Sequence, residues 1–79
     1  ELENLNIELL KNLKSLNLSY NKITDFGIKY LVNLPLSHLE KINLSGNSLT
    51  NESLNSIKSS KNLSNLETLT FTNNNIDEE

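Results

Sequence analysis

The feature that most constrains this chain is an apolar pattern that occurs three times along it. Three segments align without gaps, each with an apolar residue, mostly leucine, at positions one, four, six and eleven and an asparagine at position nine. The segments begin at Leu13, Leu39 and Leu66, which lie 26 and 27 residues apart. A fixed period of this size indicates stacked structural units, each burying its apolar side against its neighbours. We therefore expect one repeat architecture.

The first half of each unit predicts a short strand. Leu16 and Leu18 would point to one side of this strand, and Ser15, Asn17 and Ser19 to the other. The inward leucines would pack against the helix of their own unit and against the same positions of the neighbouring units. Successive strands would then lie parallel on an inner, concave face with the helices outside. The stack must curve, because helices are wider than strands.

The second half of each unit predicts a helix. Ile28 and Leu31 lie three residues apart in the first unit, and Leu54 and Ile57 do so in the second. A spacing of three places both residues of each pair on one side of a helix. We therefore expect an amphipathic helix between one strand and the next.

Sequence signals also mark the ends of these helices. Thr24 and Thr50 are placed as N-caps, so we expect each hydroxyl to accept a hydrogen bond from a backbone N–H group of the first turn. Asp25 in the first turn suits the positive end of the helix dipole. Pro35 is expected to close the first helix, and the stretch 59–62 the second.

The three aligned asparagines, Asn21, Asn47 and Asn74, lie where the chain leaves each strand and turns inward. An amide side chain can donate and accept hydrogen bonds with loop backbone that would otherwise be buried unsatisfied. We therefore expect these residues to form a structural asparagine ladder and not to contact a ligand.

In these motifs the chain resembles the leucine-rich repeat superfamily, over essentially its full length. The run from Ile23 to Leu31 looks like the ITDxGxxxL stretch of the ribonuclease-inhibitor-like and cysteine-containing subtypes, although asparagine replaces cysteine at the ladder position. The resemblance implies an α/β, right-handed solenoid, a fragment of a horseshoe, with parallel strands on the concave face and helices on the convex face. It also implies a curved protein-binding module.

The same alignment predicts how the chain is divided. Leu2, Leu5 and Leu10 keep the register of the later units, so residues 1–12 look like the helix of an earlier unit. The chain opens on Glu1 and not on Met, so we expect it to be an excerpt whose ends are covered by flanking repeats or other chains. The expected division of the single domain 1–79 is a partial repeat at 1–12, repeats at 13–38 and 39–65, and a partial repeat at 66–79.

Composition argues against several kinds of chemistry. There is no Cys, one His, and seven Lys without Arg, and the net charge is −3. We therefore expect no metal site, no cofactor and no nucleic-acid partner, and no apolar run is long enough for a membrane span. His38 beside Ser37 has no acid placed to orient its ring, so we expect no catalytic residue and no enzyme activity. The acidic residues 77–79 are expected to be a solvated helix start.

The remaining candidate site is the concave surface, which is almost uncharged and rich in hydroxyl and amide groups. Tyr20 is the aromatic residue on this surface and the best single anchor. Small solvated strand residues without a binding role would give the same pattern. Phe26 and Tyr30, on the outer helix, either mark a convex-side contact or cover a neighbouring loop. The expected partner-binding residues are Ser15, Asn17, Ser19, Tyr20, Lys41, Asn43, Ser45, Thr68, Thr70, Thr72 and Asn73.

We expect a non-catalytic interaction module that binds a protein of unknown identity through its concave face. The first alternative is a regulatory subunit or a GTPase-activator-type enzyme regulator, although a chain without Arg supplies no arginine finger. The second is a structural subunit of a large assembly. Glycans at the sequons of Asn17 and Asn43 would crowd each other on adjacent strands. We therefore expect a cytoplasmic location, or an extracellular one if the parent protein carries a signal peptide.

Overall fold

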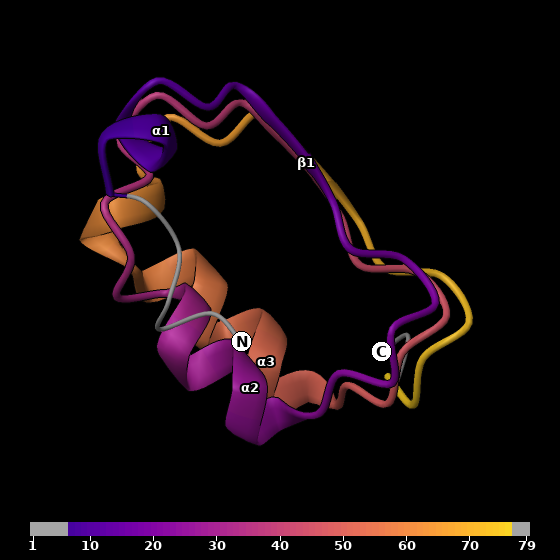
Figure 1. Cartoon of the computed structure of the whole chain (residues 1–79). Coiled ribbons are helices and arrows are strands. Elements are labelled where there is room, and N and C mark those ends of the chain that lie inside the picture. Colours follow the sequence, from indigo (N-terminus) through magenta and orange to yellow (C-terminus); the bar gives the residue numbers. More distant parts are fainter. Residues whose placement is uncertain (1–6, 77–79) are drawn as a thin grey trace.

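The fold is an α/β arrangement in which short strands alternate with helical segments (Figure 1). The computed structural model describes residues 7–76. The predictions for Leu2, Leu5 and residues 77–79 lie outside this range. The elements in chain order are α1 (Ile7–Lys11), β1 (Ser15–Asn17), α2 (Asp25–Leu31), β2 (Lys41–Asn43), α3 (Asn51–Ser59), the 3₁₀-helix η2 (Lys61–Leu63) and β3 (Thr68–Thr70).

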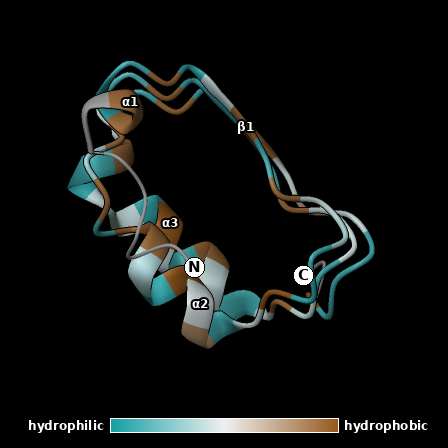
Figure 2. Ribbon diagram, in the orientation of Figure 1, coloured by the Kyte–Doolittle hydropathy of each residue, from teal (hydrophilic) through white to brown (hydrophobic). Residues whose placement is uncertain are grey.

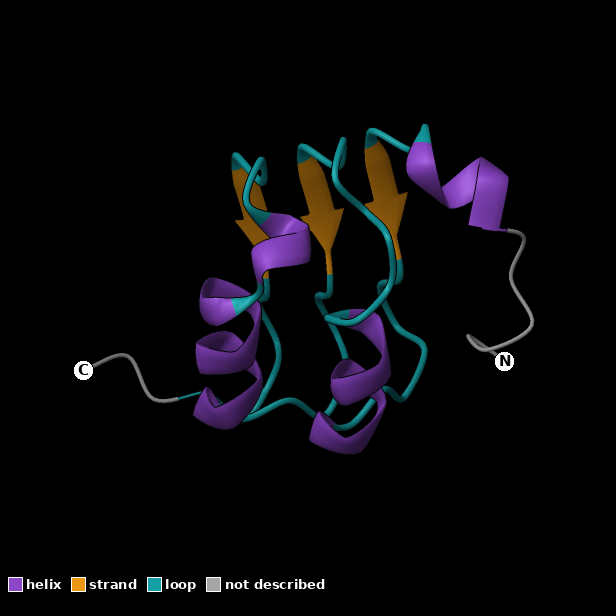
Figure 3. Cartoon of the chain, turned by 90° about the vertical axis from the view of Figure 1, so that its left-hand side faces the viewer, coloured by secondary structure: helices purple, strands orange, loops and turns teal. Residues whose placement is uncertain are grey.

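The three strands form one parallel sheet in the order β1-β2-β3 (Figure 3). Equivalent positions of successive units are paired, so Asn17 lies opposite Asn43, and Asn43 opposite Thr70. Backbone pairing continues past the strand ends, where the amide of Leu18 donates to the carbonyl of Asn43 at 2.8 Å. The parallel, in-register pairing that the sequence predicts is confirmed.

The helices α2 and α3 pack side by side across the core from the sheet (Figures 1 and 3). Apolar residues of the strands, helices and connecting turns pack together in one core, and the ribbon of Figure 2 shows these residues in brown on both layers. The aligned residues Leu10, Leu36 and Leu63 are all buried, because each occupies the same place in its turn of the chain. The other fully or nearly buried apolar residues are Ile28, Leu31, Leu39, Ile42, Leu44, Leu49 and Ile57.

The helix that the sequence predicts before β1 would occupy the positions equivalent to α2 and α3, which fall before residue 7 and lie outside the described residues. In the register of the repeat, α1 corresponds to residues 33–37 and to the region of η2, which lie between a main helix and the next strand. It is therefore not the equivalent of α2 or α3. Leu10 nevertheless keeps the buried position that the alignment predicts.

The helix ends follow the sequence signals, except at one cap. Both Thr24 and Thr50 are N-caps with extended backbone, and the hydroxyl of Thr50 accepts a hydrogen bond from the amide of Glu52 at 3.3 Å. The prediction for the Thr24 hydroxyl is wrong, because it makes no capping hydrogen bond. The Thr50 hydroxyl also donates a hydrogen bond to Asp25, an acid of the preceding helix, and this bond fixes the orientation of the hydroxyl for capping. Within residues 7–76, no helix is both long enough and apolar enough to cross a membrane.

Candidate functional site

The candidate site is the side of the sheet that faces away from α2 and α3, called here the sheet face. It consists of the outward positions of the three strands and of the residues that follow each strand. Its four rows, each crossing from β1 through β2 to β3, are Ser15–Lys41–Thr68, Asn17–Asn43–Thr70, Ser19–Ser45–Thr72 and Tyr20–Gly46–Asn73. The fold therefore brings all the sequence-predicted binding positions to one side of the sheet.

A shallow depression of about 240 Å³ lies in the middle of this surface. Leu16 and Ile42 are among the residues that line it, although their side chains belong to the core on the other side of the sheet, and Lys41 is the charged residue of the lining. The other lining residues are Ser15, Asn17, Asn43, Thr68 and Thr70. The depression is smaller than the pockets of about 300–1,000 Å³ that hold small molecules, so it suits a single side chain of a larger partner.

Asn17 and Asn43 hold their amide groups in a fixed orientation. The Asn17 Oδ1 accepts from the Ser19 amide at 3.0 Å and from the Ser19 hydroxyl at 2.7 Å, and the Asn43 Oδ1 accepts from the Ser45 amide at 3.0 Å. A backbone N–H group only donates, so the side-chain atom that faces it must be the oxygen. The two side-chain NH₂ groups are therefore left to donate elsewhere.

Ser45 is the one predicted binding residue that the structure removes from the surface. Only 7% of it is exposed, and its hydroxyl accepts a hydrogen bond from the Thr72 hydroxyl at 2.9 Å. It follows the central strand β2, where backbone pairing with both neighbouring turns continues, so Ser19 and Thr72 flank it on both sides. Its expected role as a partner contact is therefore corrected to a link between neighbouring strands.

Tyr20 is exposed and occupies a left-handed backbone conformation, as do the equivalent Gly46 and Asn73. Its ring lies so close to Gly46 that a Cβ atom there would be 2.3 Å from the ring carbons Cδ1 and Cε1. The side-chain amide of Asn73 donates to the Tyr20 hydroxyl oxygen at 3.3 Å. The aromatic ring is thus positioned by the two following turns of the chain, those of Gly46 and Asn73.

The aligned asparagines make the hydrogen bonds of a ladder. The Oδ1 of Asn47 accepts from the amides of Asn21 and Ile23, and its Nδ2 donates to the carbonyls of Leu18 and Leu44. Asn74 repeats this pattern one turn later, accepting from the Leu49 amide and donating to the Leu44 carbonyl. Asn21 is exposed, and its Nδ2 donates to the carbonyl of Ser19.

Asp25 joins the two main helices at their N-terminal ends. Its carboxylate accepts hydrogen bonds from the Thr50 amide at 3.0 Å, from the Thr50 hydroxyl at 2.5 Å and from the Ser53 hydroxyl. These bonds, with that of Ser53 foremost, lower the pKa of Asp25 below its usual value, against an opposing contribution from burial. The sequence pattern places Asp25 only at its own helix dipole and does not reveal this link.

His38 also has a structural role. Its Nδ1 lies 2.7 Å from the carbonyl oxygen of Lys11 and 3.4 Å from the Ser37 hydroxyl. A carbonyl only accepts, so Nδ1 carries the proton and donates to Lys11. Asn65, the equivalent residue of the next turn, donates to the carbonyl of Ser37 in the same way. In the described part of the chain, no three His, Cys, Asp or Glu residues gather as metal ligands.

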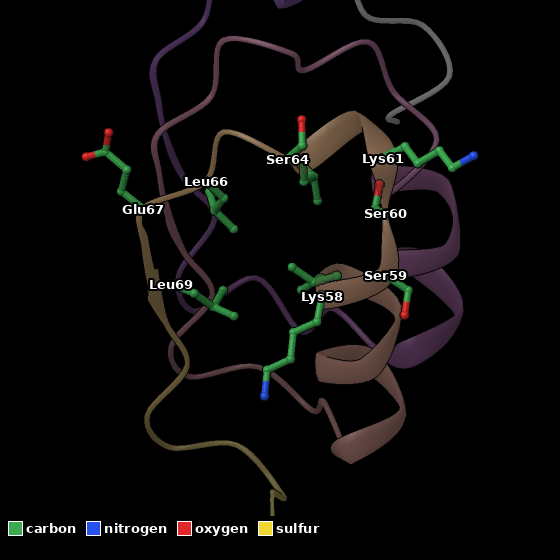
Figure 4. Close-up of a pocket in the computed structure, with 10 residues that line it drawn as sticks. Lys58, Ser59, Ser60, Lys61, Ser64, Leu66, Glu67 and Leu69 are labelled. Carbon is green, nitrogen blue, oxygen red and sulfur yellow. The ribbon is translucent and has the colours of Figure 1, made fainter.

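Two other surface features lie away from the sheet face. Phe26 and Tyr30 stay exposed on α2 and pack edge to face, with ring centroids 5.6 Å apart. A second cavity of about 570 Å³ opens between α3 and β3, and Leu66 and Leu69 point into it from the strand side (Figure 4). This cavity lies beside the free edge of β3, where a further turn of the chain would stack.

Comparison with known families agrees with this geometry. Two family models, both described as leucine-rich repeat, match residues 10–32 and 38–60, which together make up more than half of the chain. The chain is therefore a leucine-rich repeat protein. Such repeats generally mediate protein–protein interaction and are typically not enzymes. No curated protein and no solved structure shows significant similarity to the chain.

Proposed function

We propose that this chain is a non-catalytic interaction module that binds a partner protein through the sheet face. The observation that carries this proposal is the row Asn17–Asn43–Thr70, whose polar side chains stand side by side on three paired strands. The internal hydrogen bonds of the two asparagines fix their amide groups before any partner arrives. Fixed groups lose little conformational entropy on binding, and this favours recognition.

The proposal also covers the architecture of the parent protein. In it, the chain is a segment of a right-handed solenoid of the ribonuclease-inhibitor-like type, and the sheet face is part of its concave surface. Support comes from the parallel, in-register strands and from the helices that pack on their other side. The cavity beside the free edge of β3 would then be filled by a flanking repeat or by another chain.

Site-specific photo-crosslinking in the full-length parent protein tests which face binds. A photoreactive side chain replaces exposed Ser15 or Thr68 on the sheet face, and exposed Glu52 or Asn55 on α3 as matched controls. We expect partner adducts from the sheet-face positions and none from the α3 positions. Adducts from α3 alone would overturn the proposal and favour a structural subunit bound by its helices.

A cytoplasmic location remains part of the proposal. The sequon asparagines Asn17 and Asn43 are direct partners across β1 and β2, so two glycans would stand side by side on the sheet face. Their oxygens also accept internal hydrogen bonds. We expect no change in electrophoretic mobility when the protein from its native source is treated with an N-glycosidase, whereas a mobility shift would contradict this location.

A further inference from the structure

The depression in the sheet face has a chemical character of its own. The Oδ1 atoms of Asn17 and Asn43 already accept hydrogen bonds from the backbone that follows each residue. What these two side chains offer to a ligand is therefore their NH₂ groups, which only donate. The two residues are direct partners on adjacent strands, so the two donors belong to one site.

Lys41 adds a positive charge to these donors. It lies two residues before Asn43 on the same side of β2, and both residues line the depression. The hydroxyl groups of Thr68 and Thr70 border the site on the β3 side, and they can donate as well. The acids Glu40 and Glu67 lie one residue before β2 and β3, and neither lines the depression. The lining is therefore rich in donors and carries a positive charge.

We propose that this depression binds a carboxylate side chain from an acidic segment of the partner protein. A carboxylate accepts several hydrogen bonds through its two oxygens, and such charge-assisted bonds are stronger than neutral ones. It can therefore accept from both asparagine amides while the Lys41 ammonium neutralises its charge. The volume of about 240 Å³ suits one such side chain. This inference rests on the proposed function, because it names the chemistry of the partner at the same surface.

The test uses an oligoglutamate peptide with blocked ends as the probe, with oligoglutamine and oligolysine of the same length for comparison. Isotope-labelled protein is titrated with each peptide, and the side-chain NH₂ signals of Asn17 and Asn43 are followed by NMR. We expect oligoglutamate to shift both signals, while that of Asn33, which donates to a helix carbonyl away from the sheet, stays unchanged. Stronger shifts with oligolysine would overturn the proposal.

The double variant Asn17→Asp with Asn43→Asp removes the donors without removing the internal hydrogen bonds. An aspartate oxygen still accepts from the amides of Ser19 and Ser45, so these two hydrogen bonds are kept, and the circular dichroism of the variant checks that the sheet tolerates the two adjacent negative charges. We expect oligoglutamate to bind at least about tenfold more weakly to this variant. A double variant that binds as tightly as the original protein contradicts the proposal. Asn55→Asp with Ser59→Asp is the matched control, because it adds the same two negative charges at exposed positions of α3.

The variant Lys41→Gln tests the charge separately from the amides. We expect it to weaken oligoglutamate binding and to reduce the dependence of that binding on salt. If the sheet face crosslinks to the native partner but oligoglutamate does not bind, the carboxylate inference fails and the proposed function stands. If the crosslinks come only from α3, both fail.

Discussion

The ring of Tyr20 lies where a side chain of Gly46 would be. A Cβ atom at Gly46 would come within 2.3 Å of two ring carbons, so the two turns fit together only because this residue has no side chain. Gly46 also has a φ of 72°, a conformation that other L-residues adopt at a cost. The exposed ring of Tyr20 therefore owes its position to a glycine in the next turn of the chain.

The first prediction concerns Gly46→Ala. We expect it to displace the Tyr20 ring from its position over Gly46 and to destabilise the fold by more than the roughly 1–2 kcal/mol that the left-handed backbone alone costs an alanine. In a Tyr20→Ala background the same change should cost less, since the steric conflict is gone. Chemical denaturation of the two single variants and the double variant measures this coupling. Equal costs in both backgrounds would show that ring and glycine act independently.

The second prediction compares two asparagines of the ladder. Asn47→Ala removes the partner of the Asn21 and Ile23 amides and of the Leu18 carbonyl, all in the preceding turn, so we expect a loss of roughly 3 kcal/mol. Asn21→Ala is the matched control, because the exposed Asn21 side chain donates only to the nearby Ser19 carbonyl. We expect it to cost less than about 1 kcal/mol. Thermal unfolding of the two variants measures the difference. Similar losses of stability would show that the Asn47 side chain does not hold the preceding turn in place.

The third prediction concerns the pH dependence of the link between α2 and α3. The pKa of Asp25 is lowered in the folded protein, so its contribution is fully present above the unfolded pKa, near 3.8, and is lost as pH falls through the folded value. We expect Asp25→Asn to be less stable at neutral pH and to lose less stability on acidification. Denaturant titrations between neutral and acidic pH check this.

A control separates this effect from general acid destabilisation. Glu52→Gln removes an exposed acid from the first turn of α3 without breaking the link between the helices. We expect the stability of this variant to decrease on acidification as steeply as that of the original protein. Parallel curves for Asp25→Asn and the original protein would mean that the carboxylate of Asp25 contributes nothing specific.

The fourth prediction concerns His38. We expect His38→Asn to leave stability nearly unchanged, because Asn65 makes the equivalent hydrogen bond one turn later. His38→Ala removes the donor to the Lys11 carbonyl and should cost about 1 kcal/mol. Thermal unfolding of both variants checks this, and a loss in His38→Asn as large as that in His38→Ala would contradict a purely structural histidine.

Much of the fold follows from the spacing of apolar residues. Period-two alternation around Leu16 and a spacing of three after Ile28 predict the strand and the helix, and the parallel register follows from the repeat. The alignment could also have identified the role of His38, since Asn65 occupies the same position one turn later. The spacing of residues alone is enough to predict these features, because each depends on the repeated backbone geometry.

Other features could not be read from the pattern. The link from Asp25 to Thr50 and Ser53 depends on a side-chain direction across two turns, which periodicity does not encode. The burial of Ser45 depends on both neighbouring strands being present at once. The position of the Tyr20 ring depends on an absent side chain in another turn. In each case the deciding contact joins residues more than twenty positions apart.

The asparagine hydrogen bonds have a direction along the chain. Asn47 holds the backbone of the turn before it, and Asn74 holds that of the turn containing Asn47. During synthesis from the N-terminus, the loop of the newest turn therefore emerges from the ribosome before the amide that will secure it. The backbone groups of each loop stay exposed to water until about one more unit has been translated. We therefore expect each loop to become ordered only after the next unit of the chain has been synthesised.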